Sequence, residues 1–289
     1  MKENLKNYLD KKPNAKVCIL DNNSVEFLNK LKAKDISTVE IFKQYDVVLI
    51  PNWVLIEIND SRFRSDFIEE LKDNGVNIYK IQEKEYIYLA NGQELNILKI
   101  VLASVKMFQK INSYIRKNFI QGKNLEDIQY EYVEWIDKLY VNWPILGNFI
   151  KGSSRVQKKN AGEISITILA NILSYYYPKL SCITLATFDK DCYDCVNCSH
   201  EELKRDINFK EKQYCKITFK SNDFIIFELV NSNFFNKKKI ECNINIRCES
   251  RRIKYNYRAE DNSIREYYES INNNKFLKLI DDPNICIIY

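Results

Sequence analysis

The sequence is poor in histidine and lacks long apolar runs. His200 is the single histidine among 289 residues, which excludes a hydrolase that depends on two catalytic histidines. The longest apolar runs are interrupted well before the roughly 20 residues that a membrane-spanning helix needs. The first residues are polar and contain no apolar core, so no signal peptide is expected. We therefore expect a cytoplasmic protein without a membrane partner.

Charge and composition indicate a folded, soluble chain. The net charge is +5, with 44 basic and 39 acidic residues, and 45% of the residues are hydrophobic. This composition suffices for a sizeable core and excludes a disordered or fibrous chain. The small basic excess permits an anionic partner without requiring one. In the cytoplasm, the nine cysteines are expected to be thiols and not a disulfide framework.

Acids follow two apolar runs of the chain. The run Val17 to Leu20 leads directly into Asp21, and the run that begins at Ser181 leads to Asp189 and Asp191. Short apolar runs with turn-forming residues behind them are typical of strands buried on both faces. Ligands of open α/β sheets bind outside the carboxyl ends of the strands, which makes these acids candidate site residues. Each of them could instead only cap a turn or a helix.

Two further acids are expected near the starts of helices. A second strand is expected at Val47 to Ile50, and Pro51 ends it. Proline suits the first turn of a helix, and we expect this helix to continue to Gly75. Glu57 follows Pro51 by six residues. Glu163 lies in the first turn of a helix that begins near Ala161. Its carboxylate could merely interact with the helix dipole. Alternatively, all of these acids meet at one edge of the sheet.

The alternation of strands and helices in the first eighty residues predicts a mainly parallel sheet. Residues 91–150 read as a pair of long amphipathic helices separated by Gly122, an insertion that could cover the crevice or thicken one face of the domain. After Cys198, apolar and polar residues alternate, which predicts antiparallel strands, including segments 223–230 and 238–249. We therefore expect an α/β domain at residues 1–200 and a β-rich extension at residues 201–289.

Converging carboxylates would raise one another's pKa values strongly unless a cation lies among them. Oxygen ligands without histidine or thiolate suit Mg²⁺ or Mn²⁺. Metal ions in such a cluster lower the pKa of an attacking water and neutralise charge on a leaving oxygen, which suits hydrolysis of a phosphodiester. No covalent nucleophile is required. The cluster therefore predicts a metal-dependent hydrolase of nucleic acid.

The order of these motifs resembles the PIN domain, a family of metal-dependent nucleases. The matching positions are Asp21 with Asn22, Pro51 with Glu57, Gly162 with Glu163, and Thr187 with Asp189 and Asp191. The resemblance implies that Asp21, Glu57, Glu163 and Asp189 are metal-binding catalytic acids, that Asp191 is a fifth catalytic acid, and that Asn22 and Thr187 steady the cluster. It spans about Val17 to Tyr193 and implies a three-layer PIN-like fold.

The resemblance further implies an endonuclease that acts on RNA in preference to DNA. The insertion before Gly162 is longer than compact toxin-type members of the family carry, and Glu163 stands where aspartate is commoner. The alternative is a catalytically inactive PIN-like module that binds nucleic acid, or a protein partner or inhibitor, through the C-terminal region. A phosphatase of the haloacid dehalogenase type would need an aspartate at position 23, which is Asn23 here.

Three other groups of residues carry separate hypotheses. Lys151, Arg155, Lys158 and Lys159 precede Glu163 and could contact phosphates. A second group has the residue types and the close spacing of zinc or iron–sulfur ligands: Cys192, Cys195, Cys198 and His200. Thiols that follow a strand directly could instead pack in the protein core. A third group interleaves basic with aromatic residues: Arg251, Arg252, Lys254 and Arg258 with Tyr255 and Tyr257. On a strand, the basic side chains would occupy one face and the aromatic side chains the other. Such a strand could bind nucleic acid, or its basic face could simply be exposed to solvent.

Overall fold

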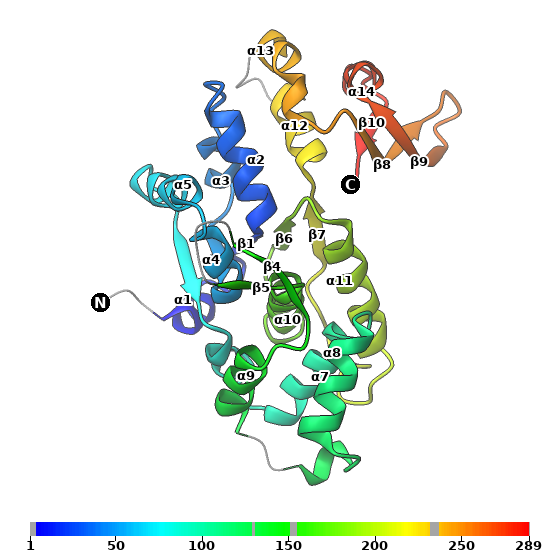
Figure 1. The fold of residues 1–289 in the computed structure, drawn as a ribbon. Coiled ribbons are helices and arrows are strands. Elements are labelled where there is room, and N and C mark those ends of the chain that lie inside the picture. Colours follow the sequence, from blue (N-terminus) through cyan, green and yellow to red (C-terminus); the bar gives the residue numbers. More distant parts are fainter. Residues whose placement is uncertain (1–3, 129–130, 151–154, 232–236, 289) are drawn as a thin grey trace.

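A central parallel sheet organises the protein (Figure 1). The computed structural model describes residues 4–128, 131–150, 155–231 and 237–288. The sheet has five strands in the order β3-β2-β1-β6-β7, and helices cover both of its faces. Its strands are β1 (Lys16–Leu20), β2 (Val47–Pro51), β3 (Ile78–Ile81), β6 (Cys182–Ala186) and β7 (Ile217–Lys220). The predicted mixed α/β architecture with a mainly parallel sheet is thereby confirmed.

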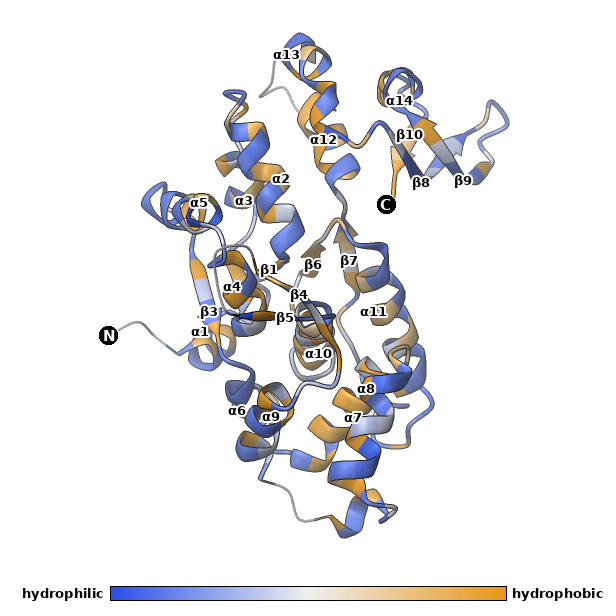
Figure 2. Cartoon of the chain, in the orientation of Figure 1, coloured by the Kyte–Doolittle hydropathy of each residue, from blue (hydrophilic) through white to orange (hydrophobic). Residues whose placement is uncertain are grey.

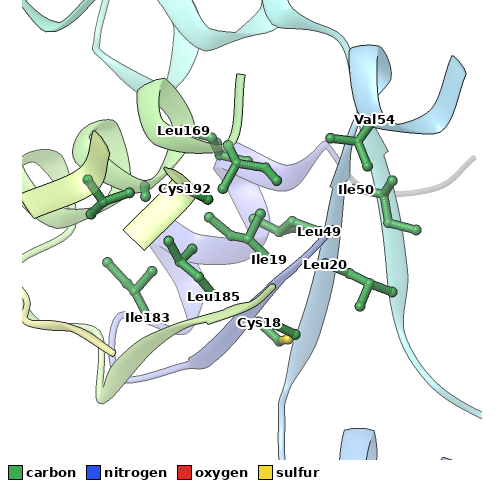
Figure 3. Close-up of a cluster of buried hydrophobic side chains, with 14 of the residues drawn as sticks. Cys18, Ile19, Leu20, Leu49, Ile50, Val54, Leu169, Ile183, Leu185 and Cys192 are labelled. Atoms are coloured by element: carbon green, nitrogen blue, oxygen red, sulfur yellow. The ribbon is translucent and has the colours of Figure 1, made fainter. Parts of the chain in front are cut away.

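The two faces of the sheet form one continuous core. Ile19 of β1 lies in register with Leu49 of β2 and Leu185 of β6, and all three side chains are fully buried. Figure 3 shows these side chains on the face that also meets Leu169. Leu169 belongs to α10 (Ala161–Tyr176), which packs on β2 and β6. Strands buried on both faces are the reason that the apolar runs show no alternation in the sequence.

The helices of the first half of the chain are α1 (Leu5–Lys11), α2 (Asn22–Lys32), α3 (Val39–Lys43), α4 (Asn52–Ile58) and α5 (Arg62–Asp73). The single helix expected between Pro51 and Gly75 is therefore two helices. Ser61, in extended conformation, is the N-cap residue of α5 and separates it from α4. Pro51 is the last residue of β2 and directly precedes the first residue of α4. Because proline lies outside the helix, its missing amide proton removes no hydrogen bond from α4.

The insertion is more broken than two long helices. η1 (Glu83–Glu85) and α6 (Tyr86–Leu89) precede it. The insertion itself contains α7 (Glu94–Ser104), α8 (Gln109–Ile115), the π-helical turn η2 (Arg116–Ile120), η3 (Leu125–Asp127) and α9 (Tyr132–Val141). A short antiparallel hairpin follows, β4 (Leu146–Phe149) with β5 (Val156–Lys158). Helix α7 packs against α10 and α11 (Lys190–Leu203). This packing thickens one face of the domain, the second of the two uses considered for the insertion.

The C-terminal region departs from the expected run of strands. It contains α12 (Asn222–Asn231), α13 (Lys237–Cys242), η4 (Ile244–Ile246), β8 (Ser250–Arg258), β9 (Ile264–Asn272), α14 (Asn273–Ile280) and β10 (Ile285–Ile287). Strands β10, β8 and β9 form an antiparallel sheet in that order. The fifth strand of the central sheet, β7, lies beyond the expected boundary at residue 200.

The strands predicted at 223–230 and 238–249 were wrong, because both segments are mainly helical. The first is mainly apolar, as the orange parts of α12 in Figure 2 show. A short continuous apolar run does not distinguish a buried helix from a strand. In the second, Ile240 and Ile244 are four residues apart, which also suits one face of a helix.

None of the helices in the described ranges has the length and apolar character that crossing a membrane requires.

Candidate active site

Asp21 lies at the carboxyl end of the central strand and begins the helix that follows. It comes directly after β1 and caps α2, because its Oδ1 accepts a hydrogen bond of 2.7 Å from the amide of Asn22. Its Oδ2 accepts a hydrogen bond of 3.0 Å from the hydroxyl of Thr187. The residue is only 5% exposed. Asp21 therefore both caps α2 and lies at the carboxyl edge of the sheet.

Thr187 ties the two acid-bearing strand ends together. Its amide donates to the carbonyl of Lys220 on β7, at 3.2 Å. Its hydroxyl donates to Asp21 and accepts a hydrogen bond of 3.0 Å from the amide of Asp189. Asp189 in turn caps α11 by accepting a hydrogen bond of 2.9 Å from the amide of Asp191. Two neighbouring strands thus present their carboxylates at one edge of the sheet.

Helices α4 and α10 bring Glu57 and Glu163 to the same place. The two helices pack against each other, and Gly162 at the start of α10 lies against Glu57. Burial and the charges of Glu163 and Asp21 raise the pKa of Glu57 to about 8. Burial and the charge of Asp21 raise the pKa of Glu163 to about 7, with smaller contributions from Asp189 and Asp191.

The electrostatics of Asp21 complete this pattern. Burial raises its pKa to about 6, and the charge of Asp189 adds to the rise, while the hydrogen bonds from Thr187 and Asn22 oppose it. The charge of at least one other acid therefore raises the pKa of each of Asp21, Glu57 and Glu163. The four acids expected to act together, Asp21, Glu57, Glu163 and Asp189, form one mutually repelling group at the carboxyl edge of the sheet.

The donor set suits a hard divalent cation. All of its side chains are carboxylates, which Mg²⁺ and Mn²⁺ favour. In the described residues, no group of three or more His, Cys, Asp or Glu side chains is arranged as a metal site. Mutual repulsion opposes a closer approach of these carboxylates, and a cation would offset that repulsion. The side-chain oxygen of Asn22, the residue after Asp21, is buried and accepts no hydrogen bond within the described part of the chain.

Glu83 is a residue that sequence reasoning missed. It is 3% exposed, and its Oε1 accepts hydrogen bonds from the amide of Trp53, at 2.8 Å, and from the hydroxyl of Ser165, at 2.7 Å. Burial raises its pKa to about 7. Because Trp53 lies in α4 and Ser165 in α10, Glu83 joins the two helices that carry Glu57 and Glu163. Its sequence context, Gln-Glu-Lys-Glu, reads as a solvated turn and gives no signal of this role.

The basic residues before α10 are partly used inside the protein. Arg155 pairs with Asp60 and donates a hydrogen bond of 3.0 Å to the carbonyl of Ile56. Lys158 contacts the carbonyl of Tyr140, and its Nζ lies 4.0 Å from the centroid of the Tyr140 ring. These contacts hold the β4–β5 hairpin beside a cavity of about 150 Å³ that Glu57 also lines. Lys159 is exposed, and Lys151 lies outside the described residues.

The cysteine group lies along α11 and packs as ordinary side chains. Cys192 and Cys195 are buried, and burial raises the pKa of both thiols, to about 12 for Cys195, which opposes formation of the thiolates that a metal needs. Figure 3 places Cys192 in the core near Leu185. Cys198 is half-buried, and the ring of His200 lies 4.6 Å from that of Tyr214. The described residues contain no metal-binding group here either.

The predicted separation of basic and aromatic faces on residues 251–258 needs one correction. These residues lie in β8, where alternate side chains share a face. Arg251 therefore shares the face of Tyr255 and Tyr257, while Arg252, Lys254 and Arg258 lie on the other. Arg251 is directed to the ring of Phe188, beside the acid group.

The chain has no significant match to a protein-family model, to a curated protein or to a solved structure.

Proposed function

We propose that this protein is a PIN-like, metal-dependent endonuclease that hydrolyses RNA in preference to DNA. The observation that carries the proposal is the group of acids described above: four carboxylates from separate segments at the carboxyl edge of a parallel sheet, Asp21 buried and the other three half-buried, with the pKa values of Asp21, Glu57 and Glu163 raised by burial and by neighbouring acids. A carboxylate with a purely structural role would not need other carboxylates close enough to raise its pKa. The order of the acids along the chain is the one on which the resemblance to the PIN domain depends.

Asp21, Glu57, Glu163 and Asp189 would hold Mg²⁺ or Mn²⁺, with Asp191 at the rim. The ion would supply a water of lowered pKa and would neutralise the charge of the leaving oxygen. Thr187 orients Asp21 through its hydroxyl, and the amide of Asp191 orients Asp189. Glu83 keeps α4 and α10 in their relative places. These supporting groups restrict the orientations of Asp21 and Asp189 and the relative places of α4 and α10, as a preorganised site requires.

The proposal is tested by incubating the purified protein with labelled single-stranded RNA and DNA of the same sequence. We expect cleavage of the RNA with Mg²⁺ or Mn²⁺ and none with a chelator. Binding of RNA without cleavage under any metal would contradict the proposed activity and favour the inactive module. Cleavage that persists in the chelator would contradict the metal-dependent mechanism.

The raised pKa values predict how stability depends on pH. Asp21, Glu57 and Glu163 hold their protons more tightly in the folded than in the unfolded chain, with folded pKa values of about 6, 8 and 7. Their stabilising contribution is complete below about pH 4 and is lost as the pH rises through these values. Without added metal, we expect the free energy of unfolding to fall by several kcal/mol between about pH 5 and about pH 8.

Urea unfolding at the two pH values, with and without Mn²⁺, measures this effect. Because Glu83 titrates in the same range, the comparison with Glu57→Gln isolates the contribution of the site. The variant should lose less stability on raising the pH, and Mn²⁺ should stabilise the wild type mainly at the higher pH. A wild-type stability that rises over this interval, or that matches the variant at both values, would refute the assignment.

Gly162 leaves room for Glu57. A Cβ atom at this position would lie 3.2 Å from Oε1 of Glu57 and 3.4 Å from Cγ2 of Val54. Alanine is favoured over glycine within helices, so Gly162→Ala should leave stability unchanged or raise it by about 0.5 kcal/mol. The displaced carboxylate should lower the cleavage rate about tenfold. Thermal unfolding and cleavage kinetics measure the two effects; unchanged cleavage in the stable variant would show that the location of Glu57 is not critical.

A further inference from the structure

Arg251 joins the C-terminal unit, defined here as residues 244–288, to the loop that carries Asp189. It is the second residue of β8, the central strand of the C-terminal sheet. Its Nη2 donates a hydrogen bond of 2.7 Å to the carbonyl oxygen of Phe188, and its guanidinium carbon lies 3.8 Å from the centroid of the Phe188 ring. A planar guanidinium can stack on a ring and donate hydrogen bonds at the same time, which a lysine cannot do equally well.

Phe188 stands between two residues of the proposed site. Thr187 on one side donates its hydroxyl to Asp21, and Asp189 on the other side is one of the four acids. The amide of Asp189 donates to the Thr187 hydroxyl, so the three residues form one connected turn. A shift of the Phe188 backbone would therefore move Thr187 and Asp189 together.

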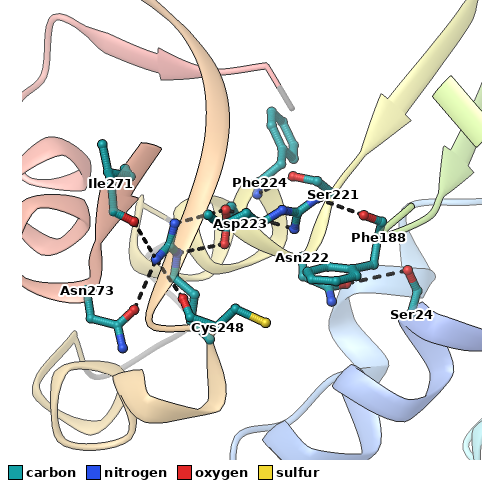
Figure 4. A network of polar contacts seen from close by, with 11 residues as sticks. Ser24, Phe188, Ser221, Asn222, Asp223, Phe224, Cys248, Ile271 and Asn273 are labelled. Atoms are coloured by element: carbon teal, nitrogen blue, oxygen red, sulfur yellow. Dashed lines mark hydrogen bonds and ion pairs between the residues drawn. The ribbon is translucent and has the colours of Figure 1, made fainter. Parts of the chain in front are cut away.

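Arg251 is itself held by a buried ion pair. Its Nη1 lies 3.9 Å from Oδ2 of Asp223, whose side chain is 1% exposed and accepts a hydrogen bond of 2.9 Å from Nε of Arg247. Arg247 also donates to the carbonyl of Ile271 and to the side-chain oxygen of Asn273, at 3.3 and 3.0 Å. Figure 4 shows this continuous series of polar contacts from Ile271 and Asn273 through Asp223 to Phe188.

We propose that Arg251 is a positioning residue, which holds Phe188 and thereby places Asp189 for the reaction. The geometry of the acid group then depends on the docked C-terminal unit. The catalytic consequence rests on the proposed nuclease function, whereas the structural consequence concerns only the backbone of residues 187–191. An experiment can therefore contradict the catalytic consequence without contradicting the structural one.

Hydrogen exchange of the full-length protein tests the structural consequence. In Arg251→Ala, we expect the amides of residues 187–191 to exchange about tenfold faster, while those of β1 keep their protection. The control is Arg252→Ala, which removes the same charge from an exposed neighbour on the same strand and should leave the loop unchanged. If Arg251→Ala does not fold, Arg251→Lys retains the charge but lacks the planar fork, and the same loop should exchange faster. Unchanged exchange of the loop in the folded variant overturns the proposal.

Cleavage kinetics test the catalytic consequence. Arg251→Ala should lower kcat for RNA by about 10- to 100-fold with KM unchanged, because a small misplacement of a catalytic group has effects of this size. Arg252→Ala should behave as the wild type. A raised KM with unchanged kcat would mean that Arg251 contacts RNA, and would overturn the positioning role. If the wild type cleaves no nucleic acid while Arg251→Ala still loosens the loop, the nuclease function fails and the positioning role stands.

Discussion

Replacing Asp21 with asparagine is expected to lower the rate of RNA cleavage by at least about 1,000-fold, which equals about 4 kcal/mol of lost transition-state stabilisation. Asparagine keeps the shape of the side chain and can still accept the amide of Asn22, so α2 should still be capped. The substitution removes a negative charge from the centre of the acid group. Single-turnover cleavage with saturating Mg²⁺ measures the effect.

The matched control is Glu26→Gln. Glu26 lies on α2, the helix that Asp21 caps, and contacts none of the four acids. It pairs at the surface with Lys30 and with Arg64, which donates to the backbone carbonyl of Glu57. Its replacement removes the same unit of charge near the site without touching the acid group, and cleavage should change little. Equal losses in both variants would show that the effect comes from overall charge, and unchanged cleavage by Asp21→Asn would refute the active site proposed here.

Breaking the ion pair between Asp223 and Arg247 is expected to destabilise the protein by about 3–5 kcal/mol. Both side chains are 1% exposed. The substitution Asp223→Ala would leave the guanidinium of Arg247 buried without its counter-charge. The carbonyl of Ile271 and the side chain of Asn273 would remain as acceptors, but neither carries a charge. Urea unfolding followed by fluorescence measures the loss.

The double variant Asp223→Leu with Arg247→Met separates the charge from the packing. Because it removes both charges and fills much of the same space, it should recover a large part of the lost stability. A loss below about 1 kcal/mol for Asp223→Ala would place the pair in the range of a surface contact and contradict its structural role.

The sequence predicts most of the candidate site because its parts are local. Asp21 and Asp189 each follow an apolar strand, and the carboxyl ends of parallel strands meet at one edge of a sheet. Glu57 and Glu163 lie on helices next to those strands. Strand, turn and helix signals within about ten residues of each acid are therefore sufficient to bring the group together.

The supporting residues could not be predicted, because their partners are distant in the chain. Glu83 meets Ser165, and Asp223 meets Arg247, only after the surrounding helices have packed. The helical state of residues 223–230 depends in the same way on packing, since α12 contacts α14 and β10 of the C-terminal unit. Local propensity is a weak guide where tertiary contacts decide the conformation.

The most direct measurement is a calorimetric titration of Mn²⁺ into the wild type and into Asp21→Asn at about pH 8, where Asp21 and Glu163 have lost most of their protons and Glu57 about half. If Asp21, Glu57, Glu163 and Asp189 form one metal centre, the wild type will show saturable binding that Asp21→Asn loses or weakens strongly. Absence of binding in the wild type, or equal binding by both proteins, would contradict the proposed metal centre.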